Sequence, residues 1–169
     1  MNASMLVKSP ATGTNSKYDS GLQSKSLYKN QLSSRLKGLA NNEYQLMLKL
    51  KFLANTLKRP SFDEVIDCCE VFSDDLMTTI NHYTLHIREL ENSSINIASI
   101  VKPCDVISYT GWVDRAKEIV RLHIDLKEQI VGIFISFKES DFPDIFHFLR
   151  QQLALHEDQL WCIRQQIEK

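Results

Sequence analysis

A run of leucines at helical spacing constrains the fold of this 169-residue chain more than any other feature. The leucines recur at three-, four- and seven-residue steps, at Leu32, Leu36, Leu39, Leu46, Leu50, Leu53 and Leu57. Such steps place side chains on one face of an α-helix, because a turn takes about 3.6 residues. An apolar face of this length must be covered by other helices. The sequence therefore predicts one long amphipathic helix packed in a bundle.

A second helix is predicted to begin at Ser61, directly after Pro60. Ser61 and Glu64 have the spacing of a capping box, in which the Glu64 side chain reaches back to the Ser61 backbone amide. The apolar face of this helix consists of Phe62, Ile66, Cys69, Phe72, Leu76, Ile80, Tyr83, Ile87 and Leu90. A polar, β-branched connection over residues 92–110 follows, and we expect it to cross the bundle with a short helix inside it.

Two further helices complete the predicted bundle. The third covers residues 112–138 and uses an apolar face of Ala116, Ile119, His123, Leu126, Ile130, Ile133 and Phe137. The fourth begins after Ser140 and Asp141, with Pro143 in its first turn, and runs to the end of the chain. Four long helices with a long connection between the second and third predict an all-α, ferritin-like four-helix bundle over residues 27–169.

Residues 1–26 differ in composition from the rest of the chain. They are rich in Ser, Thr, Asn, Gly and Lys without a sustained apolar period, so we predict a flexible N-terminal tail. The longest apolar run, residues 130–137, is too short to span a bilayer, and no secretory signal pattern precedes the first helix. We therefore expect a cytoplasmic protein without a membrane partner. The four cysteines lack zinc or redox spacing and are interpreted as free, buried thiols: Cys68, Cys69, Cys104 and Cys162.

Both ends of the chain carry motifs of a known family. The last helix holds Leu160-Trp161-Cys162-Ile163 followed by Ile167-Glu168, and the chain opens with Leu6-Val7-Lys8-Ser9-Pro10-Ala11-Thr12. These segments resemble the Dps miniferritins (DNA-binding proteins from starved cells), whose terminal helix ends in Leu-Trp-x-Ile-x-x-x-Ile-Glu. Enterobacterial members begin with a similar Leu-Val-Lys-Ser-x-Ala-Thr run. The resemblance spans the chain and implies a homo-oligomeric cage, a dodecamer, that acts in iron homeostasis, DNA binding and stress protection.

The chain departs from this family at the centre where Dps proteins oxidise iron between two subunits. With Phe62 as the anchor, the family's ligand positions fall on Ala54, Asn55, Ile66, Glu70, Asn81 and Leu85. Of these residues, only Glu70 has a side chain that binds ferrous iron, and a single carboxylate cannot outcompete water for the ion. The resemblance thus implies a cage that has lost the inter-subunit ferroxidase centre. Iron stays open as a cofactor, and so does enzymatic activity.

Replacement ligands are an alternative. His82 and His86 lie four residues apart on the second predicted helix, so they share a face and could hold a metal together. The competing interpretation is a solvated or interface pair. His123 lies on the apolar face of the third helix and is interpreted as a core histidine. His156, followed by Glu157 and Asp158, is interpreted as surface.

Two other sites follow from the resemblance. Glu139, Asp141 and Asp144 occupy the segment that lines acidic three-fold channels in Dps cages, although Asp141 and Asp144 also suit a helix N-terminus. The first thirty residues hold four lysines and one acidic residue, a net charge of +3: Lys8, Lys17, Lys25, Lys29 and Asp19. In the family such tails bind DNA phosphates, and many copies on one particle would bind by avidity. A protein of this kind would be nucleoid-associated.

Three functions therefore stay open. The leading hypothesis is a Dps-like cage without the family's ferroxidase centre, which could also fill mixed particles with a catalytic paralogue. The second is an iron-storing miniferritin with relocated ligands, and the third is a helical-bundle interaction protein of smaller assembly.

Overall fold

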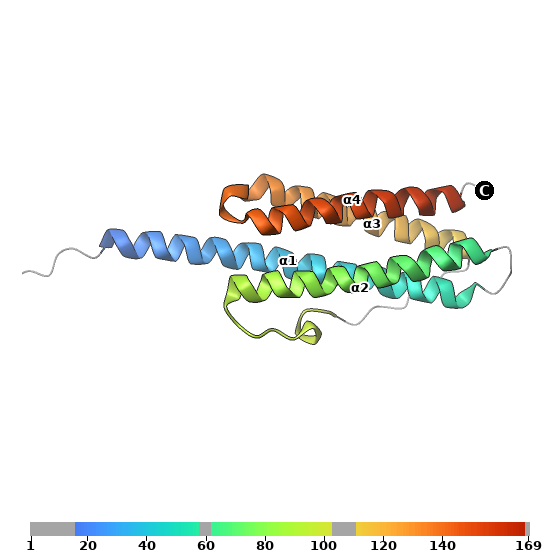
Figure 1. The fold of residues 1–169 in the computed structure, drawn as a ribbon, viewed down its shortest axis with the longest axis horizontal. Coiled ribbons are helices and arrows are strands. Elements are labelled where there is room, and N and C mark those ends of the chain that lie inside the picture. The colour runs from blue at the N-terminus through green and yellow to red at the C-terminus, as the bar shows by residue number, and fades with distance from the viewer. Residues whose placement is uncertain (1–15, 58–61, 103–110, 168–169) are drawn as a thin grey trace, which may run out of the picture.

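Four long α-helices form the protein in a computed structural model, which describes residues 16–57, 62–102 and 111–167, with side chains from residue 25 onward. They are α1 (Ser16–Thr56), α2 (Asp63–Glu91), α3 (Trp112–Ser136) and α4 (Pro143–Ile167), as Figure 1 shows. Two single turns of 3-10 helix, η2 (Ile97–Ser99) and η3 (Glu139–Asp141), lie in the connections. No strand occurs in the described part of the chain, so the all-α class and the helical bundle are confirmed.

The helices run up, down, down and up along the bundle. At one end, the last turn of α1, the first turns of α2 and α3 and the last turn of α4 line one cavity through Leu53, Val65, Trp112 and Ile167. At the other end, the Tyr28 ring of α1 packs against Phe137 and Phe142, on either side of the α3–α4 connection. Hence α2 and α3 are parallel, so the chain between them has to connect opposite ends of the bundle (Figure 1).

The described part of this crossover is tied to α1. Asn92 ends α2 in the left-handed conformation, at φ 48°, which Asn adopts more readily than most residues. Further along, the Lys102 backbone amide donates to Asn41 Oδ1 at 2.8 Å, and Gln45 Nε2 donates to the Lys102 carbonyl at 2.7 Å. Of the short helix predicted in this connection, the described residues contain the single turn η2. Residues 103–110 lie outside the description.

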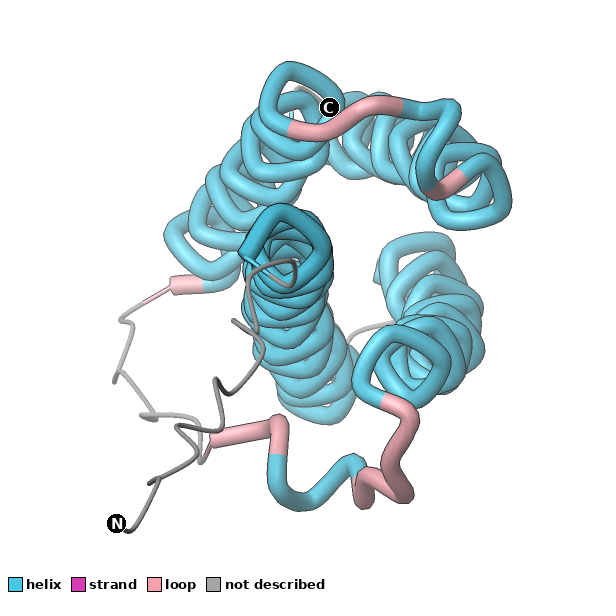
Figure 2. Tube along the Cα trace, turned by 90° about the vertical axis from the view of Figure 1, so that its left-hand side faces the viewer, coloured by secondary structure: helices cyan, strands magenta, loops and turns pink. Residues whose placement is uncertain are grey.

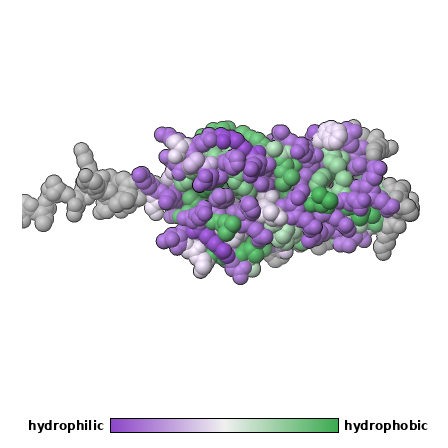
Figure 3. Space-filling model, viewed as in Figure 1, coloured by the Kyte–Doolittle hydropathy of each residue, from purple (hydrophilic) through white to green (hydrophobic). Residues whose placement is uncertain are grey.

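The predicted apolar faces form one core to which all four helices contribute (Figure 2). Every position predicted on the third helix is buried, from Ala116 to Phe137, and so are the six predicted leucines of α1 from Leu32 to Leu53. The surface in Figure 3 is mostly hydrophilic, with apolar areas small and separate. Over the described residues, no helix has the length and apolar character needed to cross a membrane.

The first helix begins earlier than the sequence suggested. It starts at Ser16, inside the tail predicted over residues 1–26, and its N-terminal turns project beyond the other helices (Figure 1). The sequence of these turns has no sustained apolar period, and the predicted boundary followed that missing period. Residues 1–15 and Ser61 of the predicted capping box lie outside the described residues; α2 is described from Asp63, with Phe62 at its N-cap.

Candidate functional site in the bundle core

The structure keeps the predicted metal ligands on α2 apart. Glu70 is exposed and lies twelve residues before His82, about 18 Å along the helix at 1.5 Å per residue. The rings of His82 and His86 both pack on Phe148 of α4, with centroid distances of 5.8 and 5.1 Å. His86 Nδ1 also lies 3.3 Å from a carboxylate oxygen of Glu89. These contacts give the histidine pair a packing role between α2 and α4.

Metal-binding geometry is absent from the described part of the chain, where no three His, Cys, Asp or Glu residues are grouped to hold an ion. The residues at the positions where Dps proteins carry iron ligands contribute to this absence. Ala54 is buried, Ile66 is half-buried, and Leu85 is 53% exposed. Asn55 and Asn81 are exposed amides.

The acidic segment between α3 and α4 is partly neutralised within the chain. Glu139, Asp141 and Asp144 are all exposed. The Arg150 guanidinium donates two hydrogen bonds to the Glu139 carboxylate, at 2.8 and 2.6 Å, and thereby lowers the pKa of Glu139. Asp141 lies in η3 and Asp144 in the first turn of α4, where a carboxylate also favours the helix N-terminus. One carboxylate of the three thus has a cationic partner in its own chain.

The predicted DNA-binding lysines divide between described and undescribed parts. Lys25 and Lys29 are exposed and lie one turn apart on α1, so they sit on a helix and not in an irregular tail. Lys17 belongs to the helical backbone of α1. Lys8 lies outside the described residues.

A chain of buried polar side chains crosses the middle of the bundle, and sequence reasoning missed most of it. Glu43 of α1, His156 of α4 and His123 of α3 each have 0% exposure. His156 joins the other two: its Nε2 lies 2.9 Å from Glu43 Oε1, and its Nδ1 lies 3.1 Å from His123 Nδ1. The core histidine predicted at 123 is confirmed, whereas the surface assignment of His156 is wrong. We call these three residues the buried polar chain.

Burial determines the protonation state of His123. Desolvation, followed by the neighbouring His156, lowers the pKa of His123 to about 3, so the His123 ring is neutral near pH 7. His156 lies within hydrogen-bond distance of both Glu43 and His123 and so gives each of them a polar partner inside the core. The arrangement links α1, α3 and α4 through polar contacts at one level of the bundle.

Several polar atoms of this region have no hydrogen-bond partner among the described residues. They are Glu43 Oε2, His123 Nε2, Tyr83 Oη and both amide atoms of Gln159. Tyr83 is fully buried, and its pKa is raised by desolvation and then by the charge of Glu43. Because buried polar groups are normally paired, these atoms add an uncompensated desolvation cost at this level of the core.

The helical register of the sequence indicates that these polar residues are buried. Glu43 fills the one gap in the leucine face of α1, between Leu39 and Leu46. On α4, the buried positions Leu149, Gln152, His156, Gln159 and Ile163 follow alternating steps of three and four residues. Polar residues that continue an apolar register are candidates for burial.

A second cluster lies where α2 and α4 meet near the cavity end of the bundle. Cys68 Sγ and Cys162 Sγ are 3.2 Å apart, and both residues are half-buried. Burial, followed by the neighbouring Cys162, raises the pKa of Cys68 to about 11, and burial raises that of the adjacent Cys69 to about 12. Cys68, Cys69 and Cys162 are free thiols, as predicted, but of these three the predicted burial holds for Cys69 alone. Cys104 lies outside the described residues.

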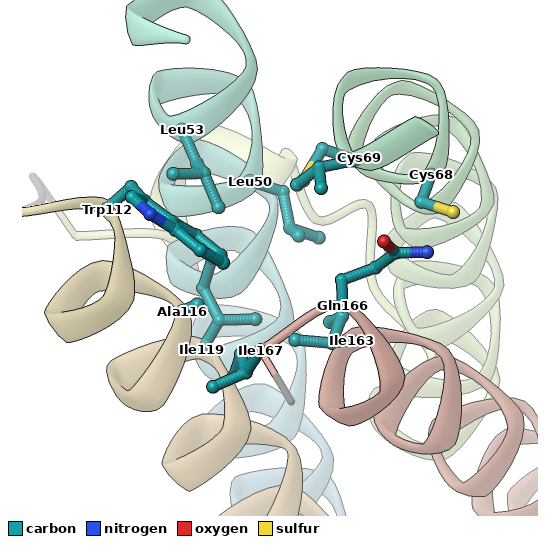
Figure 4. A pocket seen from close by; sticks show the side chains of 11 residues that line it. Leu50, Leu53, Cys68, Cys69, Trp112, Ala116, Ile119, Ile163, Gln166 and Ile167 are labelled. Carbon is teal, nitrogen blue, oxygen red and sulfur yellow. The ribbon is translucent and has the colours of Figure 1, made fainter. Parts of the chain in front are cut away.

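The adjacent residues Cys68 and Cys69 point in different directions relative to the neighbouring cavity. Figure 4 shows Cys69 directed toward Leu50 of α1, whereas the Cys68 sulfur points away from the cavity. The space open to the centre of a water molecule is about 10 Å³, close to the minimum for one water. The cavity is therefore a packing gap with little room for a ligand.

Comparison with known proteins adds no identification. Neither a protein-family model nor a curated protein matches the chain.

Proposed function

We propose that this chain is the subunit of a Dps-like cage that lacks the family's inter-subunit ferroxidase centre. The up, down, down, up path with one long crossover between parallel α2 and α3 supports the proposal, because ferritin-like bundles follow this path. The terminal motif packs as such a helix would: Leu160 and Ile163 are buried, and Trp161 is 67% exposed. The topology and the terminal motif support the same fold independently.

The residues at the family's ligand positions support a role without iron oxidation at that place. Ala54, Ile66 and Leu85 offer no donor atom, and Asn55 and Asn81 offer neutral amides that bind Fe²⁺ weakly. Ferrous oxidation needs several anionic or imidazole ligands around an open coordination position. Cage formation needs none of these ligands, so a chain can keep the family's assembly after it has lost the ability to oxidise iron.

Self-assembly requires surface that another copy of the chain can cover. Ile135 is 81% exposed and Val131, one turn earlier on α3, is 42% exposed. The two residues border a shallow groove with Ile124 and Gly132. Exposed apolar side chains that lie side by side are typical of interaction surfaces. We assign this α3 surface to contacts between copies within the cage.

The mass of the assembly in solution tests the proposal. Mass photometry or native mass spectrometry should find a dodecamer for the wild type. Ile135→Asp should shift the population to smaller species, because it places an unpaired charge in an apolar contact. Ala154→Asp adds the same charge at an exposed position of α4 and should leave the dodecamer in place. A wild type that stays monomeric or dimeric at micromolar concentration would instead support the smaller interaction protein.

We further propose that the lysines near the N-terminus attach the cage to DNA. Exposed Lys25 and Lys29 lie on the N-terminal part of α1, beside Leu90 and Glu91 at the end of α2, and each copy would add a small positive charge there. Binding by avidity should fall steeply with salt. In electrophoretic shifts across a salt series, Lys25→Gln with Lys29→Gln should weaken binding. Lys51→Gln with Lys117→Gln removes the same charge elsewhere and should have less effect. Absence of a shift at low salt would contradict DNA association.

A further inference from the structure

We propose that Cys68 and Cys162 form an oxidative modification site, at which a hydroperoxide converts the two thiols into a disulfide joining α2 to α4. The residues are 94 positions apart in sequence, yet their sulfur atoms lie 3.2 Å apart. One comes from the second turn of α2 and the other from the closing turns of α4. The fold therefore brings together two thiols that the sequence spacing did not pair.

The geometry is close to that of a disulfide. A disulfide bond is about 2.05 Å long, so the sulfurs must approach by roughly 1 Å, a distance within reach of small side-chain rotations. Cys69 does not compete for either partner, because it is 2% exposed and points toward Leu50 of α1, about 100° around α2 from Cys68 (Figure 4). The adjacent cysteines thus have different roles: Cys69 packs in the core, and Cys68 faces Cys162.

An oxidant can reach the pair from solvent. Both cysteines line an open groove with Val71, Phe72 and Trp161, and the rim carries the carboxylates of Asp67 and Asp158. Val71 is 58% exposed, so the groove mouth is not closed by the chain itself. An apolar lining with acidic neighbours favours small neutral oxidants over anionic ones. Hydroperoxides are the chemical class that fits.

The reaction balances with one hydroperoxide. The thiolate of one cysteine attacks the O–O bond, which breaks to release an alcohol, or water when the oxidant is hydrogen peroxide, and leaves a sulfenic acid. The second thiol attacks the sulfenic sulfur; an S–S bond forms, the S–O bond breaks, and water leaves with the thiol proton. Two sulfur atoms together lose two electrons, which the peroxide oxygen atoms accept.

Burial and the nearby charges determine the pKa of Cys68, and this pKa determines the pH dependence of the reaction. Burial raises the pKa of Cys68 to about 11, helped by Cys162 and by Asp67 and Glu64 on its own helix, while Asp158 faces the groove from α4. The thiolate is the nucleophile, so oxidation should be slow at neutral pH and accelerate as pH rises toward 11. Such a site responds to sustained exposure to oxidant and stays reduced through brief pulses.

The full-length protein is treated with hydrogen peroxide and, separately, with tert-butyl hydroperoxide, and its thiols are counted after denaturation. The four thiols of the chain should fall to two, and peptide mapping should find one cross-link between Cys68 and Cys162. Cys68→Ser and Cys162→Ser should each abolish the cross-link, whereas Cys104→Ser should retain it. Circular dichroism of each variant verifies that the fold is intact.

Three results would overturn the proposal: a cross-link that uses Cys69 or Cys104, a disulfide between two chains, or overoxidation of Cys68 without a cross-link. The predicted cross-link does not depend on the size of the assembly, because both cysteines belong to one chain. The outcome is therefore separate from the test of the cage.

Discussion

Replacing the buried polar chain with apolar residues should affect stability in opposite directions, depending on how much of it is replaced. Glu43→Leu alone leaves His156 buried without its carboxylate partner, 2.9 Å from the lost oxygen. Leaving a buried polar group without its partner destabilises a protein by about 1–3 kcal/mol, and by more when the group is charged. Typical domains are stable by about 5–15 kcal/mol, so this one change should remove a large fraction of the total.

Replacing all three residues should reverse the effect. In the triple variant Glu43→Leu, His123→Leu and His156→Leu, all three members of the buried polar chain become apolar, and the unpaired Glu43 Oε2 and His123 Nε2 atoms disappear. Each unpaired buried polar atom costs about 1–3 kcal/mol, so the triple variant should match or exceed wild-type stability. The stability lost in Glu43→Leu thus measures the contribution of the contact between Glu43 and His156. The stability recovered in the triple variant measures the desolvation penalty of the three polar side chains.

Urea unfolding followed by circular dichroism measures both effects, at one fixed protein concentration because assembly adds to apparent stability. Asp125→Leu, an exposed change on α3, is the control and should shift stability by about 0.5 kcal/mol or less. The reasoning fails if Glu43→Leu is as mild as this control. It fails equally if the triple variant is as unstable as the single one.

Two further predictions use the same unfolding measurements. The pKa of His123 is about 3 in the folded protein against an ordinary value of 6.5, so the unfolded chain binds more protons between these values. The stability from His123 should therefore be complete above pH 6.5 and decline as pH falls toward 3; a His123→Leu variant with an unchanged slope would contradict this. Closing the disulfide between Cys68 and Cys162 encloses a loop of roughly 95 residues and should stabilise the oxidised protein by about 3–5 kcal/mol. Equal urea midpoints before and after reduction would refute it.

Helical periodicity predicted the faces of the helices but not the contacts between them. Ile119, Leu126 and Ile130 repeat at helical spacing, and their burial follows from that pattern alone. The contact of Cys68 with Cys162 depends instead on how far α2 and α4 are displaced relative to each other along the bundle axis. The connections and the long-range packing determine this displacement, and no local pattern around either cysteine predicts it.

The polar members of the core were missed for a different reason. Glu and His are usually exposed, and His156 is followed by the exposed Glu157 and Asp158, so composition indicated surface. Register indicated the opposite, because His156 falls on the same face as Leu149 and Ile163. The first turns of α1 show the converse case, in which a helix continues without any apolar period to reveal it.

Ferrous iron oxidation by the assembled protein tests the central claim, a Dps-like cage without the family's ferroxidase centre, most directly. Fe²⁺ is added aerobically to the purified protein, and the formation of ferric product is compared with that in buffer. The rate should equal that of buffer alone, because Ala54, Ile66 and Leu85 stand where the family binds iron. Stoichiometric, accelerated oxidation that is lost in His82→Ala with His86→Ala would contradict the claim and establish relocated iron ligands.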